Sequence, residues 1–226
     1  MIYANTEAAI FLSRPNRFIA EVKVNGRHEI AHVKNTGRCK ELLVPGAELI
    51  LQRSDDPKRK TAYDLIAVYK GERLINMDSQ APNRVFLEHL NSGRYMEGLR
   101  LIKPEVRYGS SRFDFYVEAG ERKIFIEVKG VTLEEDGVVL FPDAPTQRGV
   151  KHLNELIRCF KDGYEAQVVF VIQMNGVRYF TPNHITHPAF GEALAAAEKA
   201  GVGVVALDCE VTENSLVIGR AVTVKI

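Results

Sequence analysis

The hydrophobic pattern of the chain changes near residue 80, and this change constrains the fold more than any other feature of the sequence. Between residues 17 and 77, short runs rich in β-branched and aromatic residues are separated by turn dipeptides such as Asn25-Gly26. Several short strands joined by tight turns predict a small β-barrel. Pro82 ends the β pattern, and the stretch from Asn83 to Leu99 is predicted to be mostly helical.

The rest of the chain alternates strands with helices. We expect strands at about 103–108, 112–118, 122–129, 167–173 and 202–207, helices at about 146–161 and 187–200, and a closing hairpin. A hairpin followed by a helix, a buried strand, another helix and another strand is typical of a mixed α/β or α+β fold. The sequence therefore predicts a barrel domain over residues 1–80 and an α/β domain over residues 81–226.

Composition excludes several classes of protein. Hydrophobic residues form 46% and charged residues 26% of the chain, which is typical of a globular protein with a core. The longest apolar run, Val168–Ile172, is far shorter than the ~20 residues of a membrane-spanning helix. No secretory signal is visible, so we expect a cytoplasmic protein without a membrane partner. The three cysteines are too scattered to predict disulfides or a zinc site.

Two acidic residues and a lysine are predicted to share one face of a hairpin. Side chains alternate between faces in a strand, so Glu127 and Lys129 point to the same side. In the preceding strand, Phe113 and Phe115 are expected on the apolar face and Asp114 on the opposite face. If the two strands pair, Asp114, Glu127 and Lys129 project together.

This set suits phosphodiester hydrolysis assisted by Mg²⁺ or Mn²⁺. A hard cation prefers oxygen ligands, which Asp114, Glu127 and the carbonyl of Val128 would supply. Lys129 would orient water or neutralise developing charge. The next helix offers polar side chains for phosphate contacts, namely Gln147, Arg148, Lys151 and His152. The alternative is a solvated hairpin face whose ion pairs contribute little.

Basic residues concentrate in the barrel half of the chain. Residues 14–60 contain 11 Lys or Arg and 6 Asp or Glu, a net charge of +5, although the whole chain carries only +1. Basic and aromatic side chains together on a small barrel are typical of nucleic-acid binding. The candidate DNA contacts are Arg14, Arg17, Phe18, Arg38, Lys58, Arg59 and Lys60. For the Lys58–Lys60 cluster, which follows Asp55-Asp56, a plain solvated loop is an equal alternative.

Six motifs spread over nearly the whole chain resemble the sugar fermentation stimulation protein A family. They are Asn35-Thr-Gly37, Ala81-Pro-Asn-Arg84, Arg112-Phe-Asp-Phe115, Ile126-Glu-Val-Lys-Gly-Val-Thr-Leu133, Phe141-Pro-Asp-Ala144 and Arg148-Gly-Val-Lys-His-Leu153. The resemblance implies an N-terminal OB-fold and a restriction-endonuclease-like domain with a mixed central sheet, similar to the PD-(D/E)xK nucleases. It also implies DNA binding and a link to the regulation of maltose metabolism.

Carried onto this sequence, the resemblance places the metal-binding acid at Asp114 and the (D/E)xK element at Glu127 and Lys129. It places the acid of the first helix at Glu88. The sequence departs from the pattern because Phe113, not proline, precedes Asp114. The literal Pro142-Asp143 pair comes later, and Asp143 is expected to cap the following helix, with a supporting role at the metal site as the alternative.

Three functions compete at this point. The first is a DNA-binding protein with a metal-dependent nuclease site. The second is a non-catalytic DNA-binding regulator of sugar (maltose) metabolism that keeps the nuclease-like fold. A small-molecule hydrolase has less support, because the chain has neither a Gly-x-Ser-x-Gly elbow nor a glycine-rich phosphate loop. The sequence is compatible with both a monomer and an oligomer.

Overall fold

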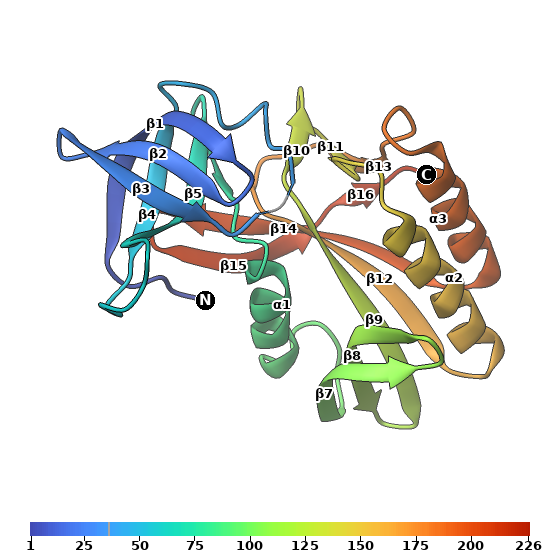
Figure 1. The fold of residues 1–226 in the computed structure, drawn as a ribbon. Helices are drawn as coiled ribbons and strands as arrows, with labels where there is room; N and C mark the ends of the chain where they lie inside the picture. Colours follow the sequence, from blue (N-terminus) through green and yellow to red (C-terminus); the bar gives the residue numbers. More distant parts are fainter. Residues whose placement is uncertain (36) are drawn as a thin grey trace.

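In the computed structural model, residues 1–35 and 37–226 are described (Figure 1). Thr36, the middle residue of the Asn35-Thr-Gly37 motif, lies outside them. The N-terminal strands are β1 (Thr6–Asn16), β2 (Ile19–Val24), β3 (Arg27–Val33), β4 (Glu48–Arg53), β5 (Tyr63–Lys70) and β6 (Arg73–Asn76). Then come α1 (Ala81–Asn91), β7 (Leu99–Tyr108), β8 (Ser111–Ala119), β9 (Arg122–Val131), β10 (Leu133–Glu135), β11 (Val138–Phe141) and α2 (Gln147–Lys161). The chain continues through β12 (Glu165–Ile172), β13 (Tyr179–Pro182), α3 (Pro188–Ala200), β14 (Gly203–Thr212), β15 (Ser215–Ala221) and β16 (Thr223–Val224).

The first five strands close into a barrel. Their order is β3-β2-β1-β4-β5, and a parallel pairing of β3 with β5 joins the two edges. β1 was not predicted from the sequence, because the β pattern was expected to begin only at Arg17. Its core contribution is confined to two buried side chains, Ala9 and Phe11, which alternate with less buried neighbours. This short signal is weaker than the apolar runs of the later strands.

The C-terminal domain is built on a mixed sheet with the order β15-β14-β12-β9-β8-β7. β12 pairs in parallel with both β9 and β14, whereas β7, β8 and β15 are antiparallel to their neighbours. α2 and α3 pack together on one side of this sheet, and α1 lies on the other (Figure 1). A smaller sheet, β10-β11-β13-β16, adjoins the ends of the longer strands.

Local sequence explains where the helices begin and end. α1 starts with Pro82 in its first turn. The N–H groups of the first turn have no partner within a helix, so the N–H that proline lacks costs no hydrogen bond. α1 ends at Asn91, so the helix is shorter than the predicted stretch, which ran to Leu99. Leu99 instead begins β7. α2 is capped by Thr146, whose hydroxyl accepts the Gly149 N–H at 3.0 Å. The prediction that Asp143 caps this helix is therefore wrong.

The two domains are joined by buried polar contacts as well as by the chain. Glu134 of β10 is 4% exposed and forms ion pairs with Lys70 at 2.8 Å and Arg73 at 2.7 Å, both from the N-terminal strands. The Gln173 amide, after β12, donates to Asn76 Oδ1 at 2.8 Å. The first residues of the chain add to the joint, because the Tyr3 N–H donates to the carbonyl oxygen of Asn214 in the β14–β15 turn.

None of the helices in the described residues combines the length and apolar character that crossing a membrane requires. The three cysteines, Cys39, Cys159 and Cys209, are free thiols in the interior.

Candidate active site

The C-terminal half of β9 presents Glu127 and Lys129 on one face, as the period of a strand predicted. The Lys129 ammonium donates to Glu127 Oε1 at 2.5 Å. Glu127 is only 3% exposed, although a carboxylate is among the groups least often buried. A buried charge needs partners, and one of them is this lysine.

His152 is the second partner of Glu127. It lies on α2, is 5% exposed, and its Nδ1 hydrogen bonds to the same oxygen, Oε1, that Lys129 contacts. The Arg148 guanidinium donates to His152 Nε2 at 3.4 Å, which leaves Nδ1 as the nitrogen that carries the proton toward Glu127. His152 was predicted to contact phosphate, but the structure places it against the Glu127 carboxylate. Arg148 is exposed, and its contact with phosphate stays a prediction.

Asp114 of β8 completes the group. Its Oδ2 accepts the backbone N–H of Val128 at 2.7 Å, so this side chain takes the place of a strand carbonyl in the ladder. Its Oδ1 accepts from the side-chain amide of Asn83 at 2.8 Å. Asn83 lies in the first turn of α1, within the Ala81-Pro-Asn-Arg84 motif, and its contact with Asp114 was not predicted from the sequence. Asp114, Glu127 and Lys129 therefore come together as predicted.

The strand around Asp114 differs from the expected alternation. Phe115 packs under α1 with Phe86, whereas Phe113 packs on the opposite side with Phe125 and His152. The prediction that Phe113 and Phe115 share one face is wrong. β8 pairs with β9 only from Phe115 onward, and Glu105, opposite Asp114 in β7, has a φ of 54°. Because of this local distortion, the two phenylalanines pack into different hydrophobic cores. Asp114 lies between them in the chain.

The two carboxylates have different electrostatic environments. Burial raises the pKa of Asp114, and the nearby charge of Glu127 raises it further. Burial also raises the pKa of Glu127, but the hydrogen bond from His152 and the charge of Lys129 outweigh it and hold that pKa below its usual range. Glu127 is therefore the carboxylate held in its charged form, and Asp114 is the one that a nearby positive charge would stabilise most.

The donor set fits a hard divalent cation. Glu127 Oε2 is buried and makes no hydrogen bond within the described residues, so it is an acceptor without a donor. Asp114 lies beside it, and the Val128 carbonyl is close in the chain. The described residues contain no cluster of three or more His, Cys, Asp or Glu side chains able to hold a metal. Two carboxylates with a carbonyl suit Mg²⁺, which keeps several waters and needs few protein ligands.

Glu88 does not join this group. Its carboxylate pairs with the N-terminal ammonium of Met1 at 2.6 Å and is 57% exposed. The assignment of Glu88 as the acid of the first helix is therefore corrected. Asn83, in the first turn of the same helix, is the residue that contacts Asp114.

Two of the arginines predicted to bind DNA have structural partners instead. The Arg14 guanidinium donates at 2.8–3.0 Å to four backbone carbonyls, those of Arg17, Asn35, Gly37 and Arg38. Arg59 grips Asp64 with two nitrogens, at 2.9 and 2.5 Å. The prediction is corrected for both residues, because the terminal nitrogens of both guanidinium groups are held by partners within the barrel.

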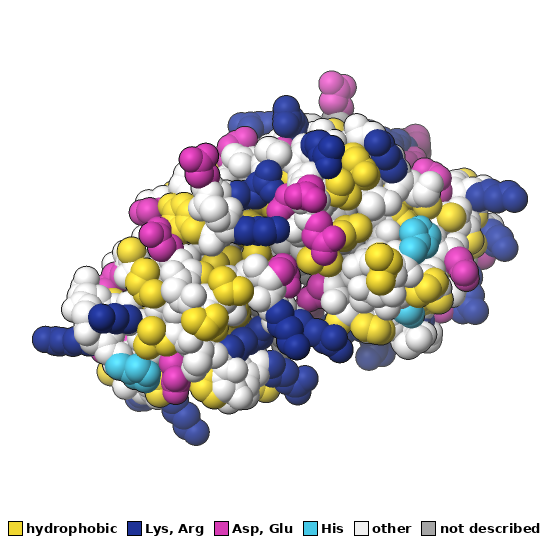
Figure 2. Space-filling view, turned by 90° about the horizontal axis from the view of Figure 1, so that it is seen from above, with side chains coloured by type: hydrophobic (Ala, Val, Ile, Leu, Met, Phe, Trp, Pro, Cys, Tyr) yellow, Lys and Arg dark blue, Asp and Glu magenta, His cyan; other side chains and the backbone are white. Residues whose placement is uncertain are grey.

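The other basic candidates on the barrel are exposed. Arg17 lies 4.8 Å from the ring centroid of Phe18, which is itself 44% exposed. Arg38, Lys58 and Lys60 are also exposed. Figure 2 shows a hollow between two lobes, with Lys and Arg side chains below it in that view and acidic side chains above it.

Lys151, the remaining candidate of α2, donates to the Ser110 carbonyl at 3.1 Å and so holds the β7–β8 turn. Asp143 lies against Gly37 of the barrel, where a Cβ on the glycine would collide with the carboxylate. Asp143 therefore belongs to the contact between the domains, and a supporting role at the metal site stays a hypothesis.

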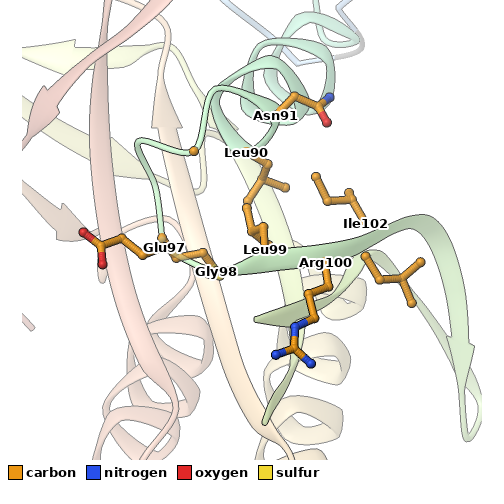
Figure 3. A pocket seen from close by; sticks show the side chains of 10 residues that line it. Leu90, Asn91, Glu97, Gly98, Leu99, Arg100 and Ile102 are labelled. Carbon is orange, nitrogen blue, oxygen red and sulfur yellow. The ribbon is translucent and has the colours of Figure 1, made fainter. Parts of the chain in front are cut away.

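A different hollow, of about 600 Å³, lies where α1 ends and β7 begins (Figure 3). Leu90, Leu99 and Ile102 are among its lining residues, and Glu97 points away from them. None of the candidate site residues lines this hollow.

The N-terminal barrel is closed by the parallel β3–β5 pairing, and the mixed sheet that follows carries an acid pair and a lysine. These features define the class of protein as an OB-fold joined to a restriction-endonuclease-like domain. A family model described as "SfsA N-terminal OB domain" matches residues 12–77, and one described as "Sugar fermentation stimulation protein RE domain" matches residues 80–215. The chain belongs to the sugar fermentation stimulation protein family, which confirms the resemblance and the fold class predicted from the sequence.

Individual relatives match over the full length. A sugar fermentation stimulation protein homolog from Desulfitobacterium hafniense (strain Y51) is 63% identical over 226 residues, covering 100% of this chain and 99% of the relative. A homolog from Ruminiclostridium cellulolyticum is 56% identical over 226 residues, covering 100% of both chains. The structure of SfsA from Pyrococcus furiosus in complex with Ca²⁺ is 31% identical, covers 100% of this chain and 98% of that chain, and gives a TM-score of 0.89.

Proposed function

We propose that this protein binds DNA and hydrolyses its phosphodiester bonds at a divalent-metal site formed by Asp114, Glu127 and the Val128 carbonyl. The observation that carries the proposal is the buried Glu127 Oε2, which has no hydrogen-bond donor among the described residues and lies near a second carboxylate and a lysine. An unpartnered buried acceptor is unfavourable, and a bound cation would relieve it.

Each side chain has a separate task in this proposal. Asp114 and Glu127 would hold Mg²⁺ or Mn²⁺, which polarises a phosphate and acidifies water. His152 and Lys129 fix Oε1 of Glu127, so that the carboxylate cannot rotate freely. Lys129, 16% exposed, is placed to stabilise charge that develops on the phosphate. Asn83 orients Asp114.

Two further observations support the proposal. The SfsA relative from Pyrococcus furiosus is described as a complex with Ca²⁺, another hard divalent cation. On the barrel, the exposed Arg17–Phe18 pair combines a cation with an aromatic stacking surface. OB-folds bind single-stranded nucleic acid with this combination of side chains.

A second candidate is a DNA-binding regulator of sugar metabolism without nuclease activity. One observation favours it. The side chain that α1 presents to Asp114 is the amide of Asn83 and not a carboxylate. Among the described residues, the site near Lys129 therefore has only two carboxylates, those of Asp114 and Glu127. With fewer acidic ligands, the site would bind a cation more weakly.

Incubation with DNA separates the two. Purified protein is mixed with single- and double-stranded DNA and with Mg²⁺, Mn²⁺ or EDTA, beside Asp114→Ala and Lys129→Ala. We expect cleavage that requires metal and falls about 100-fold or more in both variants. The matched control is Glu88→Gln, which removes a carboxylate outside the site and is expected to cleave like the wild type. Intact DNA in every condition, with binding retained, would refute the nuclease and favour the regulator.

A further inference from the structure

The β7–β8 hairpin carries two arginines directly opposite one another. Arg107 pairs with Arg112 in the strand register, and both side chains are exposed. Like charges at directly opposed positions repel, so this pair lowers stability unless an anion lies between them. The one carboxylate that contacts the pair within the described residues is Glu105, 3.5 Å from Arg112. Since both side chains of that contact are more than half exposed, it screens the repulsion only weakly.

A hollow of about 310 Å³ lies at this end of the hairpin. Its lining residues are Arg107, Gly109, Ser110, Ser111 and Arg112. Ser111 is only 6% exposed, and its hydroxyl makes no hydrogen bond to any described residue. Two exposed guanidinium groups that line one hollow supply the charged donors that phosphate oxygens need.

The hairpin end is held in place before any ligand arrives. Lys151 of α2 donates to the Ser110 carbonyl at 3.1 Å, and the Tyr108 hydroxyl donates to Asp162 beyond the end of α2. Glu155, an acid beneath the turn, is 4% exposed and is neutralised by Arg158 at 2.7 Å. A site on a fixed scaffold loses less entropy when it binds.

The hairpin also lies at a useful distance from the candidate active site. Arg112 precedes Asp114 by two residues in β8, a separation of about 7 Å along the strand. That separation is comparable with the step between neighbouring phosphates of a nucleic-acid strand.

We infer that Arg107 and Arg112 together form a phosphate site, which holds the nucleic-acid phosphate next to the one at Asp114 and Glu127. This inference rests on the proposed function, because it places the second phosphate relative to that site. An internal phosphate and the terminal phosphate of a strand offer the same chemistry to two arginines.

The test measures binding in EDTA, so that it does not depend on hydrolysis. Fluorescence anisotropy is recorded with labelled oligonucleotides for Arg107→Gln, Arg112→Gln and the double variant. Each single variant is expected to weaken binding about tenfold and to make the salt dependence shallower by about one phosphate contact. The double variant should lose little more than either single variant, because both arginines hold one phosphate.

Arg94→Gln is the matched control, since it removes an exposed arginine beyond the far end of α1 from Asn83. Unphosphorylated, 5′-phosphorylated and 3′-phosphorylated oligonucleotides and a circular single strand separate the two sources. Equal losses on all four indicate an internal phosphate, and losses confined to one phosphorylated end indicate a terminal phosphate. Binding unchanged in both single variants, or a loss equal to that of Arg94→Gln, would overturn the inference. Failure of the nuclease proposal alone would leave these losses in place while DNA stays intact.

Discussion

The ion pairs of Glu134 offer a quantitative test of how the two domains are held together. Glu134 in β10 contacts Lys70 and Arg73, which belong to the N-terminal strands, and also accepts the N–H of Gly137. Burial raises the pKa of the Glu134 carboxyl, but the hydrogen bonds from Lys70, Gly137 and Arg73 outweigh burial and lower that pKa to about 2. We predict that Glu134→Gln destabilises the protein at neutral pH.

The magnitude follows from the pKa. A drop from 4.5 to about 2 corresponds to about 3 kcal/mol of folding free energy. The side chains of Lys70 and Arg73 are 35% and 25% exposed, so screening by water reduces the expected loss to about 2 kcal/mol. Because the folded-state pKa is depressed, this stability is present above pH 4.5 and disappears as the pH falls toward 2.

Urea unfolding of the wild type and Glu134→Gln at pH 7, 4 and 2.5 measures this difference. Urea is preferred because guanidinium chloride would screen the ion pairs. We expect a gap of about 2 kcal/mol at pH 7 that closes on acidification. The matched control, Glu165→Gln, breaks an exposed pair with Arg122 and should lose less than 1 kcal/mol. Equal stability of Glu134→Gln and wild type at pH 7, or a gap at pH 2.5 as large as the gap at pH 7, would refute the reasoning.

Two further predictions concern the barrel loop and the candidate metal site. Arg14→Gln removes the donors of four backbone carbonyls and is expected to lower the free energy of unfolding by about 2–4 kcal/mol, whereas Arg17→Gln should change it by less than about 0.5 kcal/mol. Comparable values in urea melts would contradict the structural role of Arg14. Asn83→Asp places a third carboxylate beside Asp114, so without metal it should lose about 1–2 kcal/mol, and Mg²⁺ should raise its melting temperature more than that of the wild type or of Asn91→Asp. Equal Mg²⁺ shifts in all three proteins would argue against a cation at Asp114.

The parts of the site that the sequence predicted are those set by local geometry. Glu127 and Lys129 share a face because strand side chains alternate, and that rule holds for any regular strand. The same rule failed at Phe113 and Phe115, because the strand is distorted opposite Glu105 and the two rings enter different cores. A distortion that depends on pairing between distant strands leaves no signal in a window of ten residues.

The basic residues show a related limit. Counting charge in residues 14–60 treated Arg14 and Arg38 alike, but Arg14 is enclosed by carbonyl oxygens and Arg38 is exposed. Whether an arginine is available depends on which backbone oxygens come within its reach, and that is decided by the folded loop. For His152, the sequence predicted a place on the polar face of a helix. It did not predict the contact with Glu127, which lies 25 residues earlier in the chain.

The joint between the domains has a consequence for any strand that spans them. Buried contacts at Glu134, Gln173 and Tyr3 fix the barrel to the C-terminal domain that carries Asp114, so the two cannot swing independently while these contacts persist. Under the proposed function, this assembly would hold the barrel at a fixed distance from the acidic pair. The phosphate that reaches the acidic pair would then lie a constant number of nucleotides from the base that stacks on the barrel.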